Sequence, residues 1–316
     1  METLKIKKLD RNVVADYISK IVEKQYNSKV LSVNYLGGGS FGLAYKVMQD
    51  CEPSALVAKA YKVENMHKKE AYALKTLGEH TQIKYPAVYF LNDATDEFPI
   101  DCMCMEFIEG KDAFTNFALL FKPKNQKIAF AESVVNSMLE IHSFTNPKFG
   151  DIENPSYDNW LDYYKPFATE ILETSKKLRD GGKLDGYIVE TMEKAYAKFD
   201  IIFAEEVKQG SLIHGDLNVM NIMVKKPFTV AAIIDPLESK FADREYDLFQ
   251  LNNLTGKKFG LYKLYKEKYP VSKNCDIKCA FYGLWNEVYC FIKAETLFKI
   301  IMNPLVKNMK KLLERL

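Results

Sequence analysis

One run of residues, Leu212 to Asn221, constrains this chain more than any other, together with a short segment that follows it. The run reads Leu-Ile-His-Gly-Asp-Leu-Asn-Val-Met-Asn, and the later segment, 233–236, reads Ile-Ile-Asp-Pro. Apolar, strand-forming residues flank the polar ones, which favours a strand, a loop and a second strand. Such a hairpin would bring Asp216, Asn221 and Asp235 to one point.

These three side chains are two carboxylates and an amide, a set that suits phosphoryl transfer. One carboxylate can accept the proton of an attacking hydroxyl, while the amide and the second carboxylate hold Mg²⁺ on nucleotide phosphates. The spacing therefore predicts Asp216 as the catalytic group and Asn221 with Asp235 as metal ligands. Asn218 is expected to support the loop or contact a phosphate. His214 is interpreted as a buried support of the loop.

A glycine-rich segment lies between strands predicted at 30–33 and 43–47. It reads Gly37-Gly38-Gly39-Ser40-Phe41-Gly42. Glycines let backbone N–H groups approach phosphate oxygens where a Cβ would intrude. No helix and no Gly-Lys-Ser sequence follows, which argues against a Rossmann turn or a Walker loop. The segment is expected to cover phosphates, although any glycine-rich hairpin would look alike.

Lys59 stands in an apolar strand, where a lysine is costly unless a carboxylate pairs with it. Glu70, in the helix predicted at 68–77, is the favoured partner, and Glu64 and Glu79 are alternatives. A lysine paired in this way supplies positive charge to the phosphates of ATP. The competing interpretation is a surface strand whose lysine faces water.

The order of periodic segments predicts an α+β chain. Its parts are a nucleotide-binding lobe at 1–107, a hinge at 108–111 and a helical lobe at 112–316. Strands are expected at 30–33, 43–47, 55–61, 87–91, 102–107, 222–224 and 230–234. Helices are expected at 11–26, 68–77, 112–121, 125–145, 160–180, 185–208 and from about 247 to the end.

Composition excludes several classes of protein. Lys+Arg 44 against Asp+Glu 42 leaves a net charge of +2, which does not indicate nucleic acid or membrane as a partner. No apolar run suits a secretory signal, and none approaches the ~18 uncharged residues of a membrane span. Scattered cysteines indicate free thiols in a reducing cytosol, and four separated histidines argue against zinc. A cytoplasmic protein is expected, and its oligomeric state is left open.

The His-Gly-Asp sequence, with Gly215 where protein kinases carry arginine, resembles the kinases that phosphorylate small molecules. These are the aminoglycoside phosphotransferases, choline kinases and fructosamine kinases. The resemblance covers 30–250 in order and includes Asp235-Pro236 and Asp243-Arg244-Glu245-Tyr246-Asp247-Leu248. Asp247 is expected to accept N–H groups at its helix start or in the catalytic loop. Fructosamine kinases usually carry Trp after His-Gly-Asp-Leu, where this chain has Asn218.

The resemblance implies a protein-kinase-like two-lobed fold, with a small antiparallel sheet in the N-lobe and a larger helical C-lobe. It implies an enzyme that uses ATP, or alternatively GTP, with Mg²⁺ to phosphorylate a small-molecule hydroxyl. By similarity, the carbonyl of Glu106 and the N–H of Ile108 bind adenine, and Met105 lines the pocket.

Two stretches combine aromatic and acidic residues that could bind an amine-bearing, sugar-like acceptor. They contribute Trp160 with Asp162, and Trp285 with Glu287, although both tryptophans could instead be core residues. Two rival functions are kept: a silent nucleotide-binding scaffold and a protein kinase. The latter is disfavoured because only eleven residues lie between Asp235 and the predicted helix start, too few for a peptide platform.

Overall fold

The fold is that of a computed structural model, which describes residues 6–39, 41–116, 121–226, 228–253 and 256–316. The chain divides into two compact units. The first comprises Met1–Lys111, Ile222–Lys225 and Ala231–Leu237, and the second comprises Asp112–Asn221, Lys226–Val230 and Glu238–Leu316. The segment that carries Asp235 therefore groups with the N-terminal strands.

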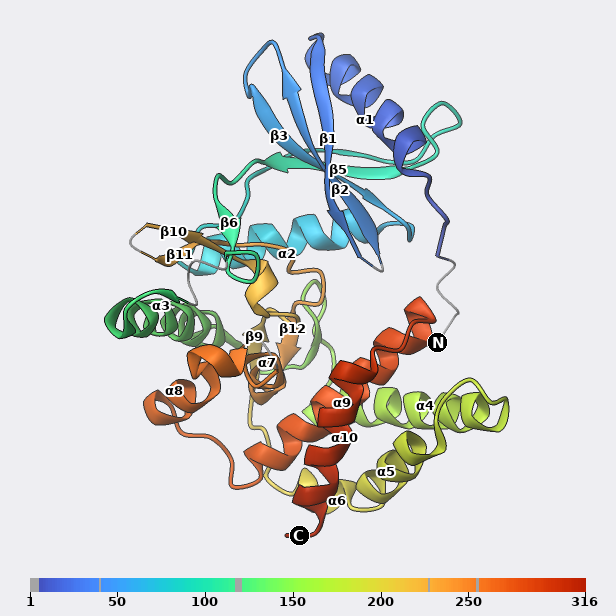
Figure 1. The fold of residues 1–316 in the computed structure, drawn as a ribbon, viewed down its shortest axis with the longest axis vertical. Helices are drawn as coiled ribbons and strands as arrows, with labels where there is room; N and C mark the ends of the chain where they lie inside the picture. Colours follow the sequence, from blue (N-terminus) through green and yellow to red (C-terminus); the bar gives the residue numbers. More distant parts are fainter. Residues whose placement is uncertain (1–5, 40, 117–120, 227, 254–255) are drawn as a thin grey trace. The chain divides into compact units, whose positions relative to one another are not determined.

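A five-stranded antiparallel sheet forms the centre of the first unit (Figure 1), with the order β1-β2-β3-β5-β4. Its strands are β1 (Val30–Gly38), β2 (Gly42–Gln49), β3 (Ala55–Tyr61), β4 (Val88–Asn92) and β5 (Asp101–Glu106). Two helices accompany it, α1 (Arg11–Tyr26) and α2 (Met66–His80). The predicted five strands, with one helix after the third, are confirmed.

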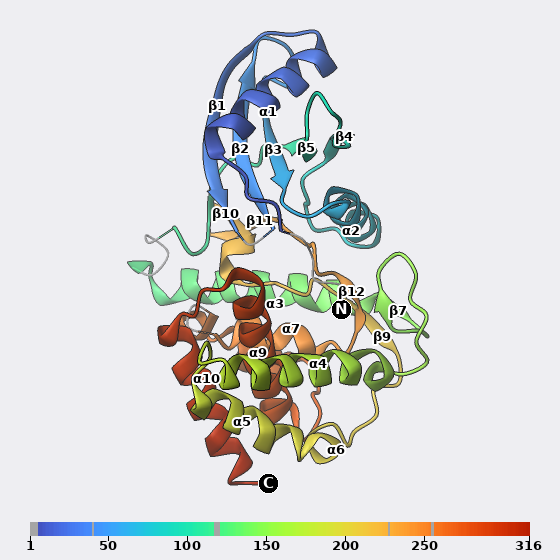
Figure 2. The same cartoon turned by 90° about the vertical axis from the view of Figure 1, so that its right-hand side faces the viewer.

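The two faces of this sheet have different coverings (Figure 2). The apolar side of α1 is buried against one face, together with alternate residues of β3: Leu56, Ala58 and Ala60. Because successive side chains of a strand point to opposite faces, Lys59 lies on the other face. The helix α2 contacts β3, β4 and β5, and its Glu70 bonds to Lys59. The alternation of side chains along β3 therefore places Lys59 on the face of the sheet that α2 contacts.

The second unit is mainly helical. Its helices are α3 (Lys124–Ser143), α4 (Trp160–Asp180), α5 (Gly186–Tyr196), α6 (Phe199–Ile202), α7 (Glu245–Leu251), α8 (Leu261–Lys268), α9 (Cys275–Ala294) and α10 (Lys299–Leu313). The helices α9 and α10 lie side by side in both ribbon views. The core between α4 and α9 is aromatic, with Trp285 stacked on Phe281 at 3.6 Å between ring centroids.

The remaining short strands form two small sheets. The strands β7 (Thr145–Asn146), β9 (Gly210–Ile213), β12 (Lys240–Ala242) and β8 (Gly150–Asp151) form one small sheet in that order. Another contains β11 (Thr229–Ile233), β10 (Ile222–Lys225) and β6 (Lys111–Asp112). Short 3₁₀ turns occupy Val219–Asn221 and Gly256–Phe259. The sequence predicted β10 and β11 but not β7, β8 or β12.

Two helix predictions are corrected. The helix expected at 112–121 is replaced in its first part by β6 and a turn, while 117–120 lie outside the described residues. The carboxylate of Asp112 accepts the N–H groups of Phe114 and Thr115, and such local bonds compete with helix formation. The helix expected at 185–208 is too long, because α5 ends at Tyr196 and only α6 follows it.

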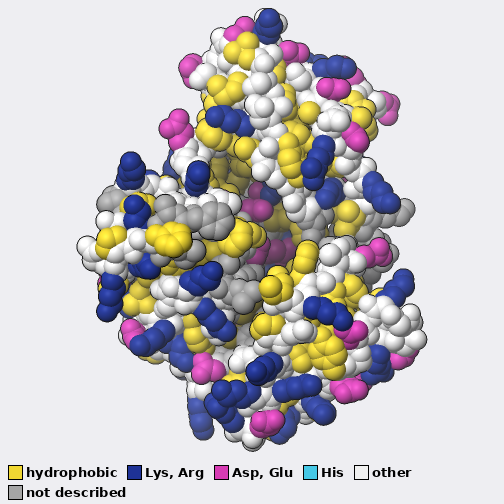
Figure 3. Space-filling view, in the orientation of Figure 1, with side chains coloured by type: hydrophobic (Ala, Val, Ile, Leu, Met, Phe, Trp, Pro, Cys, Tyr) yellow, Lys and Arg dark blue, Asp and Glu magenta, His cyan; other side chains and the backbone are white. Residues whose placement is uncertain are grey.

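Lysine side chains gather at the lower end of the second unit in Figure 3, around the C-terminal part of α10. Lys307, Lys310 and Lys311 are exposed, while Val306 and Met309 on the same helix are buried. This pattern is that of a solvated helix face. Among the residues described by the structure, no helix is long and apolar enough to cross a membrane.

Candidate active site

In the first unit, Lys59 is held between two carboxylates. Its ammonium lies 2.7 Å from Oε2 of Glu70 and 2.7 Å from Oδ1 of Asp235. Burial by itself would lower the pKa of Lys59, but Asp235 and Glu70 outweigh it and raise that pKa, so the lysine stays charged. The alternative partners are engaged elsewhere, Glu64 with Lys7 and Glu79 with Lys75.

The backbone of Asp235 is strained. Its φ is 62°, in the left-handed region, and Pro236 follows it. A non-glycine residue in that region costs of order 1–3 kcal/mol, and such strain clusters at functional sites. The side chain of Asp235 remains 46% exposed although Oδ1 contacts Lys59. The carboxylate can therefore accept a further ligand.

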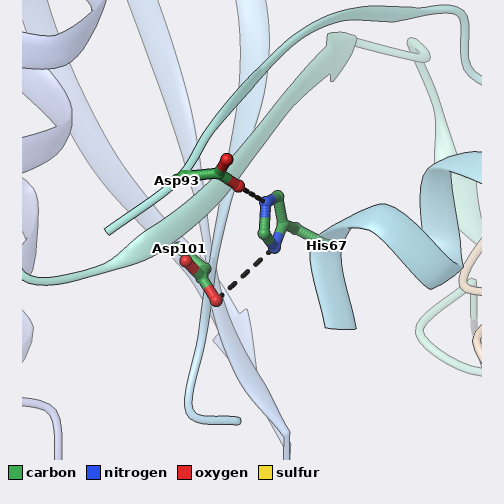
Figure 4. A group of neighbouring side chains, drawn as sticks. All are labelled: His67, Asp93 and Asp101. Carbon is green, nitrogen blue, oxygen red and sulfur yellow. Dashed lines mark hydrogen bonds and ion pairs between the residues drawn. The ribbon is translucent and has the colours of Figure 1, made fainter. Parts of the chain in front are cut away.

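His67 lies between two carboxylates in the first turn of α2, one turn before Glu70. The ring of His67 has Asp93 at Nε2, 2.7 Å away, and Asp101 at Nδ1, 3.5 Å away (Figure 4). The three residues are close enough to be considered for a metal ion. However, the two carboxylates lie at different ring nitrogens of His67. They therefore cannot both share a metal ion with the same nitrogen. We interpret the cluster as structural.

The glycines of this segment differ in the space that a side chain would have. A Cβ on Gly42 would lie 2.8 Å from the carbonyl oxygen of Ala60, so this position packs too tightly for a side chain. By contrast, among the described residues other than its chain neighbours, a Cβ on Gly37 or Gly39 would meet no atom within 4 Å. The backbone can therefore be approached closely at these two positions. Gly38 lies between them in β1, Phe41 precedes Gly42, and Ser40 lies outside the described residues.

The predicted adenine-binding segment begins where β5 ends, at Glu106. The N–H of Glu106 donates to the carbonyl of Ala87 at 2.8 Å, and its carboxylate accepts the ammonium of Lys84. Met105 pairs with Val57 in β3, and Ile108 follows outside the strand. The side chain of Glu106 thus anchors the segment through Lys84.

In the second unit, three amide side chains surround the carboxyl group of Asp216. Gln250 and Asn218 donate to its Oδ1 at 2.6 and 3.1 Å. Asn221 donates through Nδ2 to the backbone oxygen of Asp216 at 2.8 Å. Because its amide nitrogen faces Asp216, the amide oxygen of Asn221 points away and can serve as a ligand. Gln250 is not among the site residues predicted from the sequence.

Gly215 and Asp247 hold this loop in place. Gly215 has φ +83°, and a Cβ there would lie 2.2 Å from the carbonyl oxygen of Glu238, so no other residue fits. Asp247 is fully buried and accepts the N–H of Gly215 at 2.7 Å and that of His214 at 2.9 Å. Its Oδ2 also contacts Nε2 of His142 at 3.2 Å. Asp247 therefore binds the catalytic loop, one of the two positions expected for it, and His214 is buried as predicted.

We expect Asp247→Asn to lower the thermal midpoint by about 5–10 °C at pH 7, because an amide group would face N–H donors in a buried site. Burial alone would raise the pKa of Asp247, but the hydrogen bonds from His142 and His214 outweigh it and hold that pKa below the usual range of an aspartate. The ionised carboxylate of Asp247 therefore stabilises the folded state fully above about pH 4, and this stabilisation is lost as the pH falls further. Melting curves at pH 7 and below pH 3.8 test this, and an equal difference at both would contradict it.

The tryptophans predicted to face an acceptor are core residues, which corrects that expectation. Trp160 is 2% exposed and donates to the hydroxyl of Tyr282, while Trp285 is 0% exposed and donates to the carbonyl of Ala168. Asp162 lies in the first turn of α4 and bonds to Asn159. Helical spacing cannot tell a ligand-facing aromatic from a core one.

Glu287 lies on α9 and is partly buried, and this burial raises its pKa above the usual range of a glutamate. A partly buried carboxylate of this kind can pair with an ammonium group.

Comparison with known proteins gives a consistent result. Residues 12–313 match the sequence model of the fructosamine kinase family. The gentamicin complex of APH(2'')-IIa is 18% identical over 96% of each chain, with a TM-score of 0.66. ADP-bound aminoglycoside phosphotransferase APH(2'')-Ib is 18% identical over 96% of this chain and 97% of that one, with a TM-score of 0.62. A type I macrolide 2'-phosphotransferase is 12% identical over 96% and 98%, with a TM-score of 0.62. No curated protein matches the chain in sequence.

These likenesses show the protein-kinase-like α+β fold, which confirms the fold class expected from the sequence. The family match extends over nearly the whole chain. The protein therefore belongs to the fructosamine kinase family and is a small-molecule kinase.

Proposed function

We propose that the protein transfers the γ-phosphate of ATP to a hydroxyl of a small, amine-bearing, sugar-like acceptor. The observation that carries this proposal is the contact of Lys59 with both Glu70 and Asp235 at 2.7 Å. A lysine held by a carboxylate, next to a metal-binding aspartate, is the arrangement by which kinases bind nucleotide phosphates. The family name and the aminoglycoside ligands of similar folds favour a sugar-like amine as the acceptor.

The nucleotide would be bound by residues of the first unit. Lys59 neutralises phosphate charge, the backbone at Gly37 and Gly39 approaches the phosphates, and the backbone at 106–108 binds adenine beside Met105. We favour ATP over GTP, and competition between the two nucleotides measures that preference.

Asp216 would accept or orient the proton of the acceptor hydroxyl, and Asn218 would support its carboxylate. The oxygens of Asn221 and Asp235 are hard ligands of the kind that Mg²⁺ prefers. When bound, Mg²⁺ neutralises charge that develops on the phosphates. Most of the rate would come from positioning and from fixed charges.

The purified protein with ATP and Mg²⁺, offered fructosyl-lysine, gentamicin, streptomycin and choline, tests this function. We expect acceptor-dependent release of ADP and a phosphorylated product in mass spectra. Nucleotide binding without turnover would favour the silent scaffold instead.

A protein kinase remains disfavoured. The helix α7 begins at Glu245, soon after Asp235, which leaves little chain for a peptide platform. Phosphorylation of a peptide library, with none of the small acceptors, would reverse this assignment.

We expect Glu287→Ala to raise the KM of an amine-bearing acceptor about tenfold, because a partly buried carboxylate pairs with an ammonium group. The KM for ATP should not change. Asp162→Ala should raise the acceptor KM as well, because Asp162 is the other carboxylate predicted to bind the acceptor. If neither variant raises the acceptor KM, the acceptor binds elsewhere.

A further inference from the structure

Gln250 is a buried polar side chain to which the proposed reaction assigns no task. It lies on α7 and is 8% exposed. Its Nε2 donates to Oδ1 of Asp216 at 2.6 Å, and its Oε1 accepts from Nδ2 of Asn253 at 3.2 Å. The amide is therefore held at one end by Asn253 and bonded at the other to Asp216.

The helix α7 fixes the catalytic loop at two levels. Asp247 binds the backbone N–H groups of His214 and Gly215. Gln250 is three residues further along, on the same side of the helix, and binds the side chain of Asp216. One helix thus sets both the position of the loop and the rotation of its carboxylate.

The two oxygens of Asp216 differ as a result. Oδ1 accepts two amide N–H groups, from Gln250 and Asn218, and an oxygen atom offers two lone pairs. The nearest amide of Asn221 lies 3.4 Å from Oδ2, which is a long hydrogen bond. The amides of Gln250 and Asn218 therefore fix how the carboxylate of Asp216 is turned.

We propose that Gln250 is a positioning residue that holds the carboxylate of Asp216 in the orientation that receives the acceptor hydroxyl. This inference rests on the proposed phosphoryl transfer. A neutral amide suits the task, because it orients the carboxylate and favours its ionised form without neutralising it. Small errors in the orientation of a catalytic group can cost about 100-fold in rate.

The test replaces Gln250 by methionine, which keeps the length but removes the donor, and by glutamate, which adds a negative charge. The acceptor is the first member of the series fructosyl-lysine, gentamicin, streptomycin and choline that the wild-type protein phosphorylates. We expect Gln250→Met to lower kcat roughly 10- to 100-fold, the effect of one hydrogen bond to a charged group. The KM for ATP should stay within about twofold of the wild-type value, since the substitution does not remove a contact that binds ATP in the ground state.

The pH profile separates positioning from simple support of the fold. Without the donor, the acid limb of kcat should move to higher pH, and Gln250→Glu should move it further because like charges disfavour ionisation. Gln49→Met is the matched control. Gln49 is 2% exposed and bonds to Pro53 and Ser28 in the first unit, so its variant should lose stability but keep kcat and the pH profile.

The outcomes are distinct. Gln250→Met with a reduced melting temperature but unchanged kcat and pH profile would show a purely structural role and overturn the inference alone. Should that variant not fold, the nearly isosteric Gln250→Glu gives the same decision. A wild-type protein that phosphorylates none of the acceptors would overturn the proposed function, and this inference with it.

Discussion

Asp216→Asn is expected to lower kcat by about three to four orders of magnitude. An amide cannot accept the hydroxyl proton, and loss of a positioned general base costs roughly 10²–10⁴-fold. Loss of the fixed negative charge adds to that cost. The affinity for ADP should stay nearly unchanged, because the residues proposed to bind the nucleotide belong to the first unit. Single-turnover transfer and calorimetric titration of ADP measure the two quantities.

The matched control is Asp200→Asn, which changes an exposed aspartate that pairs with Lys165 at 2.9 Å. We expect wild-type turnover from it. Turnover of Asp216→Asn within a few fold of the wild type would remove Asp216 from the mechanism.

Lys59→Met is expected to have the second large effect, on both stability and nucleotide binding. The variant would leave Glu70, whose side chain is 1% exposed, buried without its cation. Removing one partner of a buried ion pair costs about 3–5 kcal/mol of unfolding free energy. Urea unfolding should show this loss, and ATP affinity should fall as well because the phosphates lose their counter-charge.

A second substitution tests the origin of the instability. In Lys59→Met/Glu70→Gln the buried charge is removed, so part of the lost stability should return while nucleotide binding does not. Lys24→Met is the matched control, since its exposed pair with Glu97 should contribute little. If the double variant unfolds at no higher urea concentration than the single variant, the broken ion pair is not the cause of the instability.

The candidate catalytic residues could be proposed from the sequence because their chemistry requires particular residue types at short spacings. Asp216 and Asn221 lie in one loop, and the structure places the amide nitrogen of Asn221 against Asp216. Lys59 was identified because a lysine inside an apolar strand needs a carboxylate partner. The choice of Glu70 over Glu64 and Glu79 required the structure, since it depends on the register of α2.

The residues that the sequence did not reveal act through long-range contacts. Gln250 is an ordinary helical glutamine until α7 is placed against the catalytic loop. The tryptophans of α4 and α9 show the same effect, because Trp160 and Trp285 would have the same helical spacing in a core or in a ligand site. Their burial is decided by the aromatic side chains that pack around them.

By itself the sequence determined the five-stranded sheet, the lysine strand and the catalytic loop, because alternation, glycine placement and local spacing act within a few residues. The tertiary structure decided the turn at Asp112, the end of α5 at Tyr196 and the contact of Gln250 with Asp216. The sequence pattern at 112–121 is helical, but Lys111–Asp112 forms the strand β6 beside β10, which is distant in sequence. Helix propensity is a weak preference of a few tenths of a kcal/mol per residue, so hydrogen bonds and burial supplied by other parts of the fold outweigh it.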